Sequence, residues 1–126
     1  MTSQHTLDPR GKDSSTILLN AVDLEFRPGG SVKFEGYAYG FDSSFFHVKD
    51  LPGEGPPLHF HPYPETWIVI KGAVRFTVGG EAIEASPGNI IVAAKEIPHK
   101  FVNIGTEVLE MVCIHPSPNI IQTNLE

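Results

Sequence analysis

The stretch Leu58-His59-Phe60-His61-Pro62-Tyr63-Pro64-Glu65 holds three potential metal ligands within seven positions. His59 and His61 are two positions apart, so on a β-strand both imidazoles point to the same face. The two prolines cannot continue a hydrogen-bonded ladder, so we expect the chain to bend there. Glu65 opens a run rich in β-branched and aromatic residues, which strands favour. If the chain folds back, the carboxylate is aimed at the space that the histidines face.

A fourth candidate ligand, His99, lies far along the chain, just before an apolar run. Only a closed β fold could bring it to the same place as the other three. Three imidazoles and one carboxylate suit a borderline divalent metal such as Mn, Fe, Co, Ni or Zn. They would leave one or two coordination positions open for water or substrate. The sequence therefore predicts one divalent transition metal bound by His59, His61, Glu65 and His99.

The spacing of the first ligands resembles the first motif of the cupins. That motif reads Gly, five residues, His-x-His, three or four residues, Glu, six residues, Gly. The matching positions are Gly53, His59, His61, Glu65 and Gly72. The resemblance implies an all-β fold, the cupin-type double-stranded β-helix or jelly-roll barrel, with a metal site inside it.

A second cupin motif has its counterpart further along the chain. It reads Gly, five residues, Pro-x-Gly, two residues, His, three residues, Asn. Here Gly88, His99 and Asn103 stand at the right intervals, whereas Ala94 replaces the proline and Glu96 replaces the glycine. These two differences affect the local turn and not the candidate ligand His99. Because this fold hosts many chemistries, the resemblance indicates the fold and the metal but no particular reaction.

Composition narrows the class of protein. With 126 residues, the chain is long enough for one domain with a single core. Fifteen acidic residues against nine basic ones give a net charge of −6, which disfavours a nucleic-acid partner. No apolar run approaches the length of a membrane span, and no signal peptide is evident. We therefore expect a soluble cytoplasmic protein with no membrane partner.

Short strands separated by turns account for most of the chain. Eleven prolines and twelve glycines punctuate apolar runs, a pattern typical of β sandwiches and barrels. We expect a polar arm at residues 1–16 and a single barrel domain with a C-terminal tail at 17–126. Strands are predicted at residues 17–26 (an edge strand), 32–39, 45–48, 58–61, 65–71, 73–78, 81–85, 90–94, 99–104 and 107–114.

Strand alternation predicts which side chains accompany the ligands. If Glu65 and His99 face inward, Trp67, Val69, Phe101 and Asn103 do so as well. On the last long strand, the inward set is Leu109, Met111, Cys113 and His115. We predict a substrate pocket lined by Trp67, Phe101, Met111 and Asn103, although ordinary core packing explains Val69, Leu109 and Met111 at least as well.

Two histidines remain outside the ligand set. His115 could be an acid/base group or a partner of a ligand, and it could equally be a strand-end histidine that faces solvent. For His47 the solvent-facing alternative is the stronger one. The single cysteine, Cys113, cannot form an internal disulfide and is expected to be a small buried hydrophobic residue.

Our leading hypothesis is an enzyme that acts on a small organic molecule, with the metal as a Lewis acid or, if it is iron, as a dioxygen site. The cupin resemblance allows dioxygenase, isomerase, decarboxylase, lyase and cyclase reactions. The aromatic residues and the absence of basic ones favour an apolar or ring-containing substrate. The alternative is a cupin that binds or senses a small ligand without turnover. We also expect a homodimer, from the polar arm, the apolar tail and the habit of the family.

Overall fold

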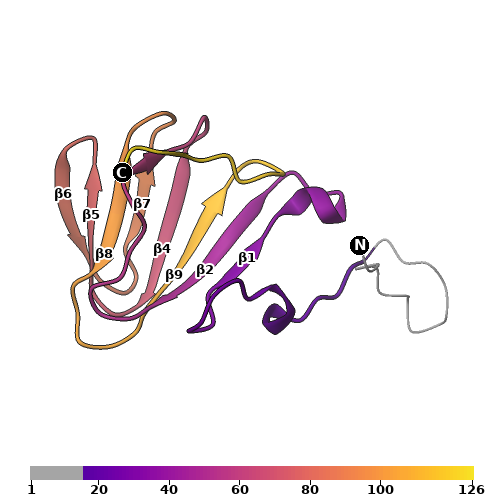
Figure 1. Ribbon diagram of the computed structural model, residues 1–126, viewed down its shortest axis with the longest axis horizontal. Helices are drawn as coiled ribbons and strands as arrows, with labels where there is room; N and C mark the ends of the chain where they lie inside the picture. The colour runs from indigo at the N-terminus through magenta and orange to yellow at the C-terminus, as the bar shows by residue number, and fades with distance from the viewer. Residues whose placement is uncertain (1–15) are drawn as a thin grey trace.

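In the computed structural model, which describes residues 16–126, the chain forms ten strands in two antiparallel five-stranded sheets. The first sheet has the order β1-β2-β9-β4-β7 and the second the order β10-β3-β8-β5-β6. The two sheets face each other in Figure 1. The predicted all-β double-stranded β-helix is therefore confirmed.

The strands of the first sheet span the middle and the end of the chain. They are β1 (Val32–Phe34), β2 (Ser44–Asp50), β4 (Glu65–Lys71), β7 (Ile90–Ala93) and β9 (Leu109–His115). Those of the second sheet are β3 (His59–Phe60), β5 (Val74–Val78), β6 (Glu81–Ala85), β8 (His99–Asn103) and β10 (Thr123–Asn124).

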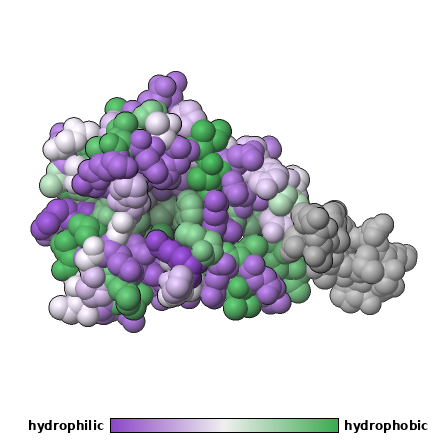
Figure 2. Space-filling view, viewed as in Figure 1, coloured by the Kyte–Doolittle hydropathy of each residue, from purple (hydrophilic) through white to green (hydrophobic). Residues whose placement is uncertain are grey.

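The core lies between the sheets and follows the predicted alternation. In β4, Trp67 and Val69 are buried while their neighbours are more exposed. The same pattern recurs in β8 and β9, whose inward side chains are all less than 10% exposed. Apolar side chains from both sheets thus form one cluster. Figure 2 shows that one face of the molecule is hollowed near its middle, with hydrophobic side chains at the bottom and hydrophilic ones around them.

Two predicted strands differ from the structure. Residues 17–26 form no edge strand; they contain the 3-10 helix η1 (Ala21–Leu24), and only Glu25 makes a bridge, to Val32. The run 32–39 stops as a strand at Phe34, and Gly36–Tyr39 forms a second 3-10 helix, η2. The chain is tightly packed at this point, since a Cβ on Gly36 would lie 2.3 Å from the carbonyl oxygen of Ser43.

Apart from Thr16, the predicted polar arm falls outside the described residues. Within residues 16–126, no helix is long and apolar enough to cross a membrane.

Candidate metal centre

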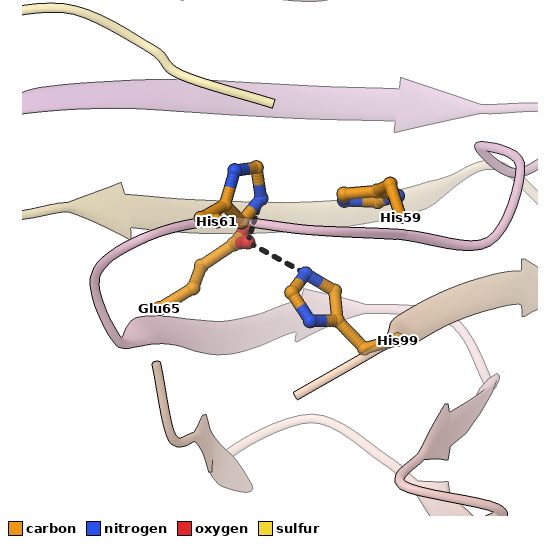
Figure 3. A group of neighbouring side chains, drawn as sticks. All are labelled: His59, His61, Glu65 and His99. Atoms are coloured by element: carbon orange, nitrogen blue, oxygen red, sulfur yellow. Dashed lines mark hydrogen bonds and ion pairs between the residues drawn. The ribbon is translucent and has the colours of Figure 1, made fainter. Parts of the chain in front are cut away.

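Both sheets contribute to the predicted ligand set. His59 belongs to β3 and pairs directly with His99, the first residue of β8. His61 follows β3, and Glu65 is the first residue of β4 in the opposite sheet. The bend that the two prolines predict carries the chain from one sheet to the other. Figure 3 shows the four side chains directed toward a common point.

The four predicted ligands converge closely. One donor atom from each of His59, His61, Glu65 and His99 lies within 4.8 Å of the others. All four residues are at most 5% exposed. Glu65 Oε1 lies 3.0 Å from His61 Nε2 and 3.1 Å from His99 Nε2. The structure thus brings together residues that are up to 40 positions apart in the sequence.

Backbone carbonyls fix the tautomer of the three imidazoles. Nδ1 of His59 donates to the Pro57 carbonyl at 2.6 Å, and Nδ1 of His61 donates to Ile121 at 2.7 Å. Nδ1 of His99 donates to the carbonyl of Ile97 at 2.9 Å. With the proton on Nδ1, each neutral ring keeps the lone pair of Nε2 for the interior of the site. This is the arrangement that metal-binding histidines use.

The donor set fits a divalent metal on its own chemistry. Nε2 of His61 is buried and has no aligned hydrogen-bond partner, although it lies beside the Glu65 carboxylate. Nε2 lone pairs and carboxylate oxygens repel one another unless a proton or a cation lies among them. Buried imidazoles and a carboxylate suit Mn, Fe, Co, Ni or Zn. The residues present could therefore hold such an ion.

Burial and neighbouring groups keep two of the donors, His59 and Glu65, in the protonation states that a metal requires. Burial lowers the pKa of His59 to about 4, so this imidazole is neutral at pH 7. Burial alone would raise the pKa of Glu65, but hydrogen bonding from His115, and from His61 and His99 when their Nε2 atoms carry a proton, outweighs it and holds the pKa well below its usual range. The site therefore presents neutral His59 and an ionised carboxylate.

His115 lies beside the ligand set. Its Nε2 is 3.1 Å from Oε2 of Glu65, the carboxylate oxygen that does not face His61 and His99. Its Nδ1 lies 2.7 Å from the hydroxyl of Tyr63. With 1% exposure, His115 is a buried partner of Glu65, so the solvent-facing alternative is wrong. His47 is instead partly exposed and lies 3.5 Å from Glu110 on the outside of the sheet.

The sequence analysis did not single out Tyr63, which lies between His61 and Glu65 in the stretch 58–65. Its ring stacks on His61 at 5.2 Å between centroids, with 5° between the ring planes. Its hydroxyl accepts a hydrogen bond from the amide of Ile121. Burial raises the pKa of Tyr63 to about 12, so the hydroxyl keeps its proton. Its position two residues after His61 was the signal in the sequence that could have placed Tyr63 beside the site.

A cavity of about 190 Å³ opens onto the site. Of the ligand set, His59 and Glu65 line it, and His115 joins them. The remaining lining residues come from several elements: Phe26, Arg27, Phe46, Val48, Pro56, Phe101, Cys113 and Gln122. The cavity is therefore mostly apolar.

Only one of the four predicted pocket residues, Phe101, lines this cavity. Trp67 and Met111 are in the hydrophobic core instead, and Trp67 packs edge-on against His99 at 5.0 Å. The Asn103 amide donates to the carbonyls of Asp50 and Glu107, so it holds loops together. Strand alternation correctly predicted that these four side chains point inward. It could not distinguish side chains that line the cavity from those that pack in the core.

The expectation that the pocket lacks basic residues is wrong. Arg27, from the turn after η1, lines the cavity, and its guanidinium bonds the buried carboxylate of Asp50 and the hydroxyl of Ser31. It also lies over the ring of Phe26 at 5.1 Å. No local pattern marks Arg27 in the sequence, because its position depends on how the segment before β1 packs beside the cavity.

Comparison with known proteins places this geometry in context. The family model described as "Cupin domain" matches residues 46–115. The chain is 32% identical over 81 residues to a protein named "Polyketide synthase CurC" from Streptomyces cyaneus, and the match covers 63% of this chain. The chain spans about half the length of that curated relative, 52%.

Solved structures share the fold at low sequence identity. An oxalate decarboxylase from Lactobacillus farciminis, in a formate complex, has a TM-score of 0.78 and 23% identity over 95% of this chain and 39% of its own. An oxalate decarboxylase from Bacillus subtilis, studied for its Mn(II) centres, has a TM-score of 0.77 and 21% identity over 95% and 35%. A double-stranded β-helix protein from Klebsiella pneumoniae has a TM-score of 0.68 and 22% identity over 85% and 89%.

Proposed function

The chain belongs to the cupin domain family, and from this premise we propose that it is an enzyme that converts a small organic molecule at one divalent transition metal. His59, His61, Glu65 and His99 would hold the ion. The observation that carries the proposal is the set of three Nδ1–carbonyl hydrogen bonds, which leaves three Nε2 lone pairs next to one buried carboxylate. When bound, the metal supplies Lewis acidity or, if it is iron, dioxygen chemistry.

The identity of the metal is open among Mn, Fe, Co, Ni and Zn, since all accept imidazole and carboxylate donors. The Mn(II) centres of the Bacillus subtilis oxalate decarboxylase make manganese the first ion to test.

The size and lining of the cavity suggest a small substrate with an apolar body. At about 190 Å³ the cavity is smaller than the roughly 300–1,000 Å³ of sites for drug-sized ligands. Phe46, Val48 and Phe101 offer apolar contact, and Arg27 offers N–H donors that its bonds to Asp50 and Ser31 leave free. We propose a ring-containing or branched substrate with an acceptor group for Arg27.

Several residues of the chain have distinct roles in this proposal. Glu65 places negative charge beside the imidazoles, and the cavity walls exclude water from the substrate. His115 faces the cavity with Nε2 near Glu65, while the Tyr63 hydroxyl donates to its Nδ1. In this arrangement His115 is the candidate to move a proton to or from the substrate.

The alternative is a cupin that binds a small ligand without turnover. Nothing in the four donors separates the two functions, because a metal can hold a ligand as well as activate it. We also propose that the protein is a cytoplasmic homodimer.

Metal analysis of purified protein tests the metal site. His61→Ala and Glu65→Ala should each lower metal content strongly, whereas His47→Ala, which changes a partly exposed histidine outside the site, should leave it unchanged. Full occupancy in the first two variants would contradict the proposed ligands.

A substrate screen in air and under nitrogen then tests turnover. Activity in air alone selects dioxygen chemistry, and activity in both atmospheres selects a lyase, isomerase or cyclase. Ligand binding with no turnover in either atmosphere would favour the binding protein over the enzyme.

A further inference from the structure

The C-terminal segment, residues 117–126, is tied to the barrel at its start. The hydroxyl of Ser44 donates to the carbonyl of Ser117 at 2.7 Å, and this contact is buried. The amide of Ile120 donates to the Glu35 carboxylate at 3.0 Å. The segment therefore begins its course beside the end of β9, at the junction with the N-terminal elements.

The same segment is tied down again on the other sheet. Its strand β10 pairs with β3, the strand that carries His59. Beyond β10, the amide of Leu125 donates to the Leu58 carbonyl at 2.8 Å, and the Leu58 amide donates to the Glu126 carboxylate at 2.8 Å. Figure 1 shows this segment, in yellow, running across one end of the molecule between the end of β9 and the C-terminus.

Between these two attachments, the backbone of Ile121 contacts residues of the candidate metal centre. Its carbonyl accepts the Nδ1–H of His61 at 2.7 Å, and its amide donates to the Tyr63 hydroxyl at 3.1 Å. The Ile121 side chain is 49% exposed. The residue therefore acts on the site through its backbone and not through its side chain.

The contacts continue from Tyr63 to the carboxylate. Because the Tyr63 oxygen accepts the Ile121 amide, its own proton is available for Nδ1 of His115 at 2.7 Å. That leaves the His115 proton on Nε2, which is buried and lies 3.1 Å from Oε2 of Glu65, an ion-pair contact without aligned hydrogen-bond geometry. The backbone of Ile121 is thus bonded directly to a ligand histidine and, through Tyr63 and His115, connected to a contact with the ligand carboxylate.

We propose that residues 117–126 complete the metal centre: the Ile121 carbonyl orients His61 directly, and the Ile121 amide orients Glu65 through Tyr63 and His115. The inference rests on the metal binding proposed above. The segment lies beyond residue 115, where the match to the family model ends. Ile121, Tyr63 and His115 are positioning residues in this scheme.

Two substitutions in the full chain break the same link from opposite sides. Tyr63→Phe removes the hydroxyl, and Ile121→Pro removes the amide proton while leaving the carbonyl for His61. Tyr37→Phe is the matched control for the first, because Tyr37 is 61% exposed and its hydroxyl has no partner among the described residues. Thr106→Pro, in the loop between β8 and β9, is the control for the second, since Thr106 is exposed and its amide makes no hydrogen bond within residues 16–126.

The readout is the affinity for Co²⁺ alone, followed by its visible absorption bands. Changes in groups that orient metal ligands typically cost about 10–100-fold in affinity, and we expect a loss of that order for Tyr63→Phe and Ile121→Pro. We also expect shifted Co²⁺ bands, which a loss of stability alone would not produce. The double variant Tyr63→Phe, Ile121→Pro should bind Co²⁺ no more weakly than whichever single variant binds it less tightly, because both substitutions remove the same Tyr63–Ile121 hydrogen bond. Affinities within twofold of wild type, additive losses, or equal losses in the controls would overturn the proposal.

A second measurement needs no metal. In the metal-free wild type, the Ile121 amide should be protected from hydrogen exchange, and Tyr63→Phe should remove that protection while leaving the β10 amides unchanged. An unprotected Ile121 amide in the wild type would overturn the proposal even if Co²⁺ binding is normal. Failure of the wild type to bind Co²⁺, Mn²⁺, Fe²⁺, Ni²⁺ or Zn²⁺ would instead refute the proposed metal function.

Discussion

Glu96 is the one residue other than glycine with a positive φ within residues 16–126. Its φ of 64° lies in the left-handed region, which side chains with a Cβ rarely adopt. The second cupin motif has glycine at this position, and the departure in the sequence therefore falls on the residue that needs the unusual backbone. The turn still forms, and the Glu96 amide donates to the His61 carbonyl at 2.8 Å.

Glu96→Gly should stabilise the protein by about 0.5–1 kcal/mol. The left-handed conformation costs a residue with a Cβ roughly 1–2 kcal/mol, and the greater freedom of glycine in the unfolded chain offsets about half of that gain. The midpoint of urea denaturation measures the change. Glu96→Ala is the control, because alanine keeps the strained backbone. A glycine variant no more stable than the alanine variant would contradict the assigned strain.

Cys113 should be inert in the folded protein. It is 2% exposed, and burial raises the pKa of its thiol well above the usual value, so little thiolate forms even at pH 9. A thiol reagent such as DTNB at pH 8 should give almost no signal until urea unfolds the chain, after which one thiol per chain should react. Rapid labelling of the native protein would show that the cavity admits reagents to this side chain.

Among the elements, the loop before β3 fixes the position of the first ligand. The Gly53 amide donates to the Asn103 carbonyl at 2.9 Å, and the Asn103 amide returns a bond to Glu54. A Cβ on Gly55 would lie 1.8 Å from the carbonyl oxygen of Phe101 in β8. The loop can therefore lie this close to β8 only with glycine at position 55, and it leads directly into His59.

Gly55→Ala should destabilise the protein by about 1–3 kcal/mol, the usual cost of inserting a methyl group where backbone already fills the space. It should also weaken Co²⁺ binding, because the displaced loop carries the Pro57 carbonyl that holds His59. Thermal unfolding and Co²⁺ titration measure both effects. Gly105→Ala, whose Cβ would meet ordinary contacts of 3.4–3.5 Å, should change neither. A Gly55 variant with wild-type stability would mean that the loop moves freely.

Local patterns in the sequence predicted the elements that carry the ligands but not those that frame the cavity. Ligand spacing, strand alternation and the cupin resemblance predicted that His59, His61, Glu65 and His99 lie close together, and the structure brings their donor atoms within 4.8 Å of one another. Arg27 and Ile121 reach the site through the tertiary packing of segments that precede and follow the matched motifs, and Ile121 contacts it through its backbone. No side-chain pattern records such packing, and the apolar run 17–26 even suggested a strand where the structure has a 3-10 helix.

On the whole molecule, the outer face of the first sheet carries an apolar patch over β4, β7 and β9. Ile68 stands opposite Ile90 on β7 and opposite Val112 on β9, so these side chains are neighbours on the face that points away from the core. Ile90 and Val92 are 65% and 62% exposed. A contiguous apolar patch of this kind is typical of an interface. Such a patch can pack against the same patch of a second copy around a twofold axis.

We therefore expect a homodimer through this face and a monomer when the face is charged. Sedimentation equilibrium should give the wild type about twice the 13.8 kDa mass of one chain. The double variant Ile90→Glu, Val92→Glu should sediment as a monomer, because dimerisation would bury four carboxylates without partners. Ile83→Glu, on β6 of the other sheet and 41% exposed, is the control and should leave the dimer intact. A monomeric wild type would refute the dimer, and a dimeric double variant would exclude this face as its interface.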